Sequence, residues 1–129
     1  MTREGEINSY RDLLIWQKGM ALAKQIYLMT RAFPEDERFG PITQMRRAAV
    51  SVPSNIAEGQ ARQGRNEFVQ FLSYAEGSLA ELDTQLKLAD DLGSCRNVNV
   101  PQTVGMVVEL QKMIASLRRK VIGRTTTSV

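Results

Sequence analysis

The sequence predicts an all-α fold, an antiparallel up-down-up-down four-helix bundle. Apolar residues recur at alternating steps of three and four, which is the spacing of a helix with one buried side. No segment alternates in steps of two for long enough to predict a strand. Four helical patterns of comparable length with short links are typical of a bundle in which each helix adds one apolar stripe to the core. We expect helices over about residues 12–33, 41–58, 66–92 and 101–122.

The first helix carries two neighbouring apolar seams. One seam contains Leu13, Trp16, Met20, Ala23 and Tyr27, and the other contains Ile15, Leu22, Ile26, Met29 and Phe33. Two seams imply that this helix is buried on two sides. Ser9 or Asp12 can cap its amino end by accepting hydrogen bonds from backbone N–H groups, and Pro34 stops it.

The second helix starts at Pro41, since the first helical turn does not need a proline N–H. Its apolar stripe continues through Pro53, which leaves the Ala49 carbonyl without its bond and should kink the helix. We expect one structural motif that begins at the proline and consists of Pro53, Asn55, Glu58 and Gly59. We expect Asn55 and Glu58 to bond the backbone or a neighbouring arginine such as Arg62, with a functional role as the alternative.

The third helix has a length of about 40 Å at 1.5 Å per residue, and Gly93 terminates it. Pro101 opens the fourth helix, and Gly123 ends it. We expect residues 1–124 to form a single domain and residues 125–129, TTTSV, to be a flexible tail.

Composition fits one globular domain of 129 residues, with 43% hydrophobic and 24% charged side chains. The longest apolar runs, such as residues 13–16, are far shorter than a membrane span or a signal-peptide core. A cytoplasmic protein with no membrane partner is therefore expected. The single cysteine, Cys95, lies in a predicted loop and has no partner for an internal disulfide.

The sequence does not predict an enzyme. It contains no histidine, which excludes a Ser-His-Asp triad, a Cys-His pair and the Glu-x-x-His signature of di-iron bundles. The segment GQARQG lacks the Lys-Ser/Thr ending and the preceding strand of a phosphate-binding loop. Asp83, Asp90 and Asp91 are read as solvated acids. We expect no catalytic residue, no cofactor and no metal site.

The net charge of +3 is unevenly distributed along the chain. Residues 38–65 carry a balance of +4, residues 66–91 carry −5, and the chain from Pro101 onward returns to +4. Two basic zones therefore flank an acidic third helix, and such asymmetry is informative about partners.

Two longer runs and three residue pairs carry a resemblance to a known family. They are the run RRAAVSVPSNIAEGQAR from Arg46 to Arg62, the run FLSYAEGSLAELDTQL in the third helix, and the first-helix pairs Trp16-Gln17, Ile26-Tyr27 and Phe33-Pro34. The chain resembles the four-helix bundle proteins encoded within intervening sequences of bacterial 23S rRNA genes. It is also similar to the accessory variability protein of diversity-generating retroelements. That similarity implies a ring-shaped homopentamer and binding to RNA or to a ribonucleoprotein.

Seven cations are candidates for contact with nucleic acid: Arg46, Arg47, Arg62, Arg65, Arg118, Arg119 and Lys120. The first four could form a basic strip that attracts phosphates, largely through counterion release. The alternative is that they pair with the acidic third helix as ordinary surface ion pairs. The last three lie near the carboxyl end of a helix, where cations also favour the helix dipole.

The charge distribution and the resemblance together predict a non-enzymatic homo-oligomer that binds structured RNA or an RNA-protein complex, and the resemblance implies that the oligomer is a pentamer. Recognition would use phosphates and shape, because several of the few aromatic residues, such as Trp16, Phe68 and Phe71, fall on or beside apolar seams. The alternative is a protein-protein adaptor that binds nucleic acid only incidentally. The second seam of the first helix favours it, since exposed apolar surface must be covered by something.

Overall fold

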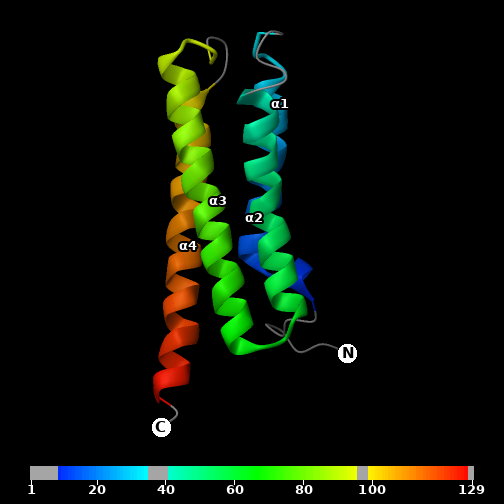
Figure 1. The fold of residues 1–129 in the computed structure, drawn as a ribbon, viewed down its shortest axis with the longest axis vertical. Coiled ribbons are helices and arrows are strands. Elements are labelled where there is room, and N and C mark those ends of the chain that lie inside the picture. The colour runs from blue at the N-terminus through cyan, green and yellow to red at the C-terminus, as the bar shows by residue number, and fades with distance from the viewer. Residues whose placement is uncertain (1–8, 35–40, 96–98, 128–129) are drawn as a thin grey trace.

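The computed structural model describes residues 9–34, 41–95 and 99–127. Within them the chain forms a short 3-10 helix, η1 (Tyr10–Asp12), and four α-helices: α1 (Leu14–Thr30), α2 (Thr43–Ala61), α3 (Arg65–Asp91) and α4 (Val100–Thr127). The described residues contain no strand. Figure 1 shows that the four α-helices alternate in direction along one long axis. The predicted all-α four-helix fold is confirmed.

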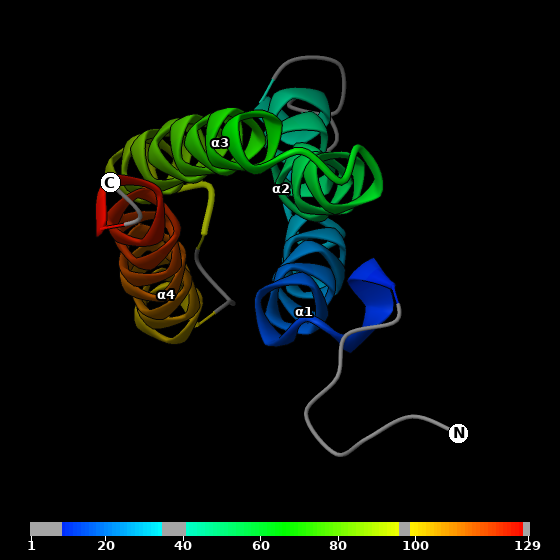
Figure 2. The same ribbon diagram turned by 90° about the horizontal axis from the view of Figure 1, so that it is seen from below.

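The helices follow one another around the bundle in chain order, as the view along the axis shows (Figure 2). Consecutive helices are in contact, and α4 also contacts α1. Two contacts fix α1 and α4 as antiparallel, because Gln25 bonds Thr103 while the earlier Lys18 pairs with the later Glu109. The core consists of one buried stripe per helix. Its largest fully buried members are Leu22, Ile26, Met45, Ile56, Leu72, Leu79, Leu82, Leu86, Leu110 and Ile114.

The first helix is shorter than predicted at both ends. The Ser9 hydroxyl accepts from the Arg11 N–H, and the Asp12 carboxylate accepts from the Ser9 N–H, so both capping candidates serve η1. Leu13 is then extended (φ −75°, ψ 126°), which separates η1 from α1. The other end stops at Thr30, and Phe33 stays buried as part of a turn after the helix.

Helices α2 and α4 run past their expected ends at residues 58 and 122. Helix α2 continues through Gly59 to Ala61, and α4 continues through Gly123 to Thr127, which places helix where part of the tail 125–129 was expected to be flexible. The physical reason is that glycine costs about 1 kcal/mol inside a helix, without the steric block of proline. Gly93, at φ 81°, does follow the end of α3. Residues 128 and 129 lie outside the described residues.

Pro53 lies inside α2 and is buried. It sits against α1, where Gly19 leaves the space: a Cβ on Gly19 would lie 3.4 Å from the Pro53 Cβ. A proline ring and a glycine backbone therefore meet where these two helices cross. The kink expected at Pro53 stays a prediction.

Candidate nucleic-acid interface

The seven predicted cations lie in three separate places. Arg46 and Arg47 are near the start of α2, Arg62 and Arg65 flank the turn between α2 and α3, and Arg118, Arg119 and Lys120 are in the second half of α4. Arg46 and Arg62 are 16 positions apart, which is about 24 Å along a helix at 1.5 Å per residue. The first four cations therefore do not form one continuous strip, and each place is considered by itself.

Arg46 connects α2 to the end of α1. Its Nε donates to the Thr30 hydroxyl at 2.9 Å, its guanidinium donates to the Tyr27 carbonyl at 3.4 Å, and its Cζ lies 4.6 Å from the centre of the Tyr27 ring. The Tyr27 carbonyl belongs to the last turn of α1, where a positive charge favours the helix dipole. Arg46 thus has a structural task inside its own chain.

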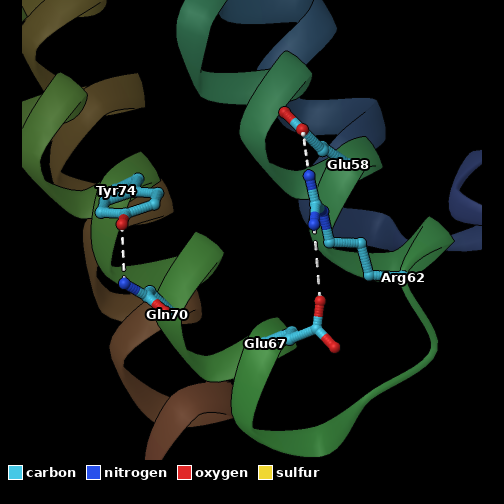
Figure 3. A network of polar contacts seen from close by, with 5 residues as sticks. All are labelled: Glu58, Arg62, Glu67, Gln70 and Tyr74. Atoms are coloured by element: carbon cyan, nitrogen blue, oxygen red, sulfur yellow. Dashed lines mark hydrogen bonds and ion pairs between the residues drawn. The ribbon is translucent and has the colours of Figure 1, made fainter.

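Arg62 lies between two carboxylates at the end of α2. Figure 3 shows its guanidinium reaching Glu58 of α2, at 3.1 Å, and Glu67 of α3, at 3.6 Å. The hydrogen bond to Glu58 and the negative charges of both carboxylates raise the pKa of Arg62 above its ordinary value, against the opposing effect of burial. The centre of the Phe71 ring lies 5.1 Å from the Cζ atom. Its donors are therefore shared among groups of the same chain.

Arg118 forms the closest ion pair between α3 and α4 within the described part of the chain. Its Nε donates to a Glu76 carboxylate oxygen at 2.5 Å, and a second nitrogen lies 3.4 Å from the other oxygen. This hydrogen bond and the charge of Glu76 raise the pKa of Arg118. Both side chains are about 70% buried. Pairing with the acidic third helix, the alternative given for the first four cations, is thus part of what Arg62 does. Arg118 also pairs with this helix, a contact that the sequence did not predict for it.

The other four predicted cations are exposed. Arg47, Arg65, Arg119 and Lys120 form no ion pair or hydrogen bond through their side chains with the residues that the structure describes. Arg119 also lines a shallow hollow of about 370 Å³ on the outside of α4, together with Lys112, Gln111, Ala115 and Glu76. Lys112 was not among the predicted site residues. Its spacing of seven and eight positions from Arg119 and Lys120 places it on the same side of the helix, and that spacing is readable in the sequence.

The motif around Pro53 forms local contacts. The Asn55 amide donates to the Ser51 carbonyl at 2.8 Å, and Glu58 accepts from Arg62 as described above. Gly59 is buried at the crossing with α3, where an added Cβ would lie 2.7 Å from the Phe71 Cβ. These contacts lie within α2 or between α2 and α3. The charged member of the motif, Glu58, is paired with Arg62.

Comparison with known proteins places this bundle in a family. The model of the 23S rRNA-intervening sequence protein family matches residues 11–116. The chain belongs to this family. A solved structure from Bacteroides thetaiotaomicron, described as a protein of unknown function from the S23 ribosomal protein family, is similar with a TM-score of 0.75 and 21% sequence identity, over 81% of this chain and 98% of that one. At this identity the likeness shows the fold. No curated protein matches the chain.

A hollow lies on the outside of α1 and α2. It has a volume of about 680 Å³ and continues at Tyr27, Val50 and Ser54 into a second hollow of about 620 Å³. We call the two together the α1/α2 groove. Its apolar walls include Trp16, Met20, Tyr27, Leu28, Val50 and Ala57, and its cations are Lys24, Arg31, Arg46 and Arg47. Its α1 wall includes the predicted seam with Trp16, Met20, Ala23 and Tyr27. The other predicted seam, with Ile15, Leu22, Ile26, Met29 and Phe33, is buried in the core.

The described residues also bear on metal binding and on membrane insertion. Among the residues described, no group of three or more His, Cys, Asp or Glu side chains is placed to hold a metal ion. No helix in the described ranges is long and apolar enough to cross a bilayer. Cys95 is buried in the turn after α3.

Proposed function

We propose that this protein is a non-enzymatic, self-associating helical bundle that binds structured RNA, alone or within a ribonucleoprotein. The observation that carries the proposal is the set of exposed cations on the outside of α4, Lys112, Arg119 and Lys120. None of the three is in an ion pair with a described residue. Arg65, also exposed, adds a fourth charge at the turn before α3.

These cations suit a phosphate backbone. Each cation that neutralises a phosphate releases condensed counterions, so the binding is strong at low salt and carries little sequence information. Trp16, Phe68 and Phe71 are partly buried, so they offer little face for stacked bases. RNA would therefore be recognised through its shape and its backbone, as duplex regions commonly are.

Self-association is the second part of the proposal. The α1/α2 groove leaves apolar walls open to solvent, with Leu28 57% and Val50 42% exposed. Apolar surface of this kind commonly marks an interaction site. The resemblance to the retroelement accessory protein implies a closed ring of five copies. This ring stays a prediction, and so does the cytoplasmic location expected from the sequence.

The test compares two charge-matched variants in RNA binding. The first variant removes the α4 cations (Lys112→Gln, Arg119→Gln, Lys120→Gln), and the control removes three cations of η1, α1 and α3 (Arg11→Gln, Lys18→Gln, Lys87→Gln). Fluorescence anisotropy is measured against a structured 23S rRNA fragment and a scrambled RNA of equal length, across a salt series. We expect the slope of log K against log salt to fall by about 2 in the α4 variant, since each lost phosphate contact removes about 0.7–0.9.

The two variants should differ if the α4 face is the site. Equal losses in both would mean general charge attraction and would contradict the assignment to α4. Preference for the 23S fragment over the scrambled RNA, at physiological salt, is the result expected for a structured RNA partner.

A second candidate function is a protein-protein adaptor whose client helix lies in the α1/α2 groove. The observation that favours it is the groove itself, because apolar walls flanked by polar residues fit an amphipathic helix. A chain that stays monomeric, and whose RNA affinity does not depend on the α4 cations, would favour this second candidate.

A further inference from the structure

The charge of the α1/α2 groove restricts what can occupy it. Lys24, Arg31, Arg46 and Arg47 border the groove, and no acidic side chain does so among the residues described. Two copies that met groove to groove would bring eight cations together. Like charges across an interface are unfavourable, so the occupant is expected to carry acids beside its apolar residues.

The outer side of α3 has this combination. Tyr74, Glu81, Leu88 and Leu92 are spaced by seven, seven and four positions, so they lie along one side of the helix. All four are exposed, Leu88 at 57% and Leu92 at 71%. Asp91 is exposed beside Leu92. We call these five residues the α3 ridge. Helix α3 belongs to the stretch of the sequence with a charge balance of −5.

We propose that the α3 ridge of a second copy of this chain occupies the α1/α2 groove. The inference rests on the self-association proposed above and names its two surfaces. Their lengths agree: Trp16 to Arg31 spans about 22 Å of α1, and Tyr74 to Leu92 spans about 27 Å of α3, at 1.5 Å per residue. Leucine side chains of the ridge would enter between apolar walls, with Glu81 and Asp91 beside the groove cations.

The two surfaces lie on different sides of one protomer. Figure 2 shows η1, in dark blue, and α3 on opposite sides of α2. Tyr10 of η1 borders the groove. Each copy can therefore accept a ridge on one side and offer its own ridge on another. Such a head-to-tail contact produces a ring when its rotation closes and a filament when it does not.

The first experiment measures molar mass by light scattering for two variants. Leu28→Glu places an acid in the groove, where it repels the acidic ridge, and Leu88→Arg places a cation on the ridge, where it repels the groove. Both residues are 57% exposed, so the fold should tolerate the changes. The control is Leu14→Glu, since Leu14 is 55% exposed and lies outside both surfaces. We expect both variants to elute at the mass of one chain, 14.5 kDa, and the control to keep the wild-type mass.

The second experiment mixes the two monomeric variants. The groove variant keeps an intact ridge and the ridge variant keeps an intact groove, so one competent interface remains per pair. We expect a one-to-one dimer of the two variants and no larger species. An interface made of one self-complementary surface would not give this result. Arg31→Glu and Glu81→Arg form a second pair of variants that leaves the apolar residues in place. Each reversal alone should weaken self-association, whereas the two introduced charges are opposite in sign, so mixing these variants should restore assemblies larger than a dimer.

The outcomes distinguish self-association itself from the assignment of its two surfaces. A wild-type chain that is monomeric at all concentrations would overturn self-association itself. A multimer that survives Leu28→Glu or Leu88→Arg would overturn only the groove and ridge assignment. Monomeric variants that fail to form the mixed dimer would also overturn it. In each variant, unchanged circular dichroism shows that helicity is intact.

Discussion

Two glycines of the bundle differ in the space around them. An added Cβ at Gly59 would lie 2.7 Å from the Phe71 Cβ, whereas nothing lies within 4 Å of a Cβ at Gly77. We expect Gly59→Ala to destabilise the protein by about 1–3 kcal/mol through overpacking. Gly77→Ala should stabilise it by up to about 1 kcal/mol, because alanine is the better helix former. Urea unfolding of both variants checks this, and equal effects would mean that the crossing at Gly59 is looser than the structure indicates.

Arg118 has two possible partners, the Glu76 carboxylate and an RNA phosphate. Glu76→Gln removes the charge that holds the guanidinium, at 2.5 Å, against α3. If RNA binds along α4, the freed cation should add one phosphate contact and steepen the salt dependence by about 0.7–0.9 in log-log slope. The measurement is the anisotropy salt series for the variant and the wild type. A matched change, Asp83→Asn, frees Lys87 of α3 instead and should leave the slope unaltered.

At the scale of elements, Arg46 joins α1 to α2. Its charged guanidinium donates to the Thr30 hydroxyl and lies over the Tyr27 ring. Hydrogen bonds to charged groups contribute about 1.5–3 kcal/mol to stability. Arg46→Ala should therefore lower the free energy of unfolding by about 1–3 kcal/mol. Arg47→Ala, the exposed neighbour, should change it by less than about 0.5 kcal/mol. Both are measured by chemical denaturation at one protein concentration, and equal losses would contradict a joining role for Arg46.

The helices were predictable because their signal is repeated. Each core stripe appears several times at steps of three and four, so errors at single positions do not alter the result. The helix ends depend on single local contacts instead. The pairing of Ser9 with Asp12 formed η1 rather than extending α1, and Gly59 and Gly123 were tolerated inside helices although glycine commonly follows a helix end.

The candidate site was predictable in composition but not in arrangement. Charge counts along the sequence identified the seven cations, and the spacing of Lys112 from Arg119 could have added an eighth. What the sequence does not encode locally is which of them have partners. Arg46 reaches Thr30 across 16 positions and Arg118 reaches Glu76 across 42, and such contacts exist only after the helices have packed.

At the scale of the whole molecule, RNA binding and self-association involve different surfaces. Self-association should nevertheless change RNA affinity, because it sets how many α4 faces one assembly presents. The α4 face and the α1/α2 groove come from different helices, so a groove contact between copies leaves the α4 cations exposed. An assembly would then present several α4 faces to one RNA. Linked sites of this kind raise overall affinity by about 10²–10⁴ without any new contact, provided that the RNA reaches more than one of them.

This valency gives a prediction that joins both proposals. Leu28→Glu, which we expect to be monomeric, should bind a long structured RNA at least about 100-fold more weakly than the wild type. For a short duplex that covers one α4 face, its affinity should stay within about threefold, because the contact with one protomer is unchanged. Anisotropy with both RNAs at one salt concentration measures the two ratios. Equal loss on both RNAs would mean that Leu28 itself lies in the RNA-binding surface, and the groove would then be an RNA site rather than a contact between copies.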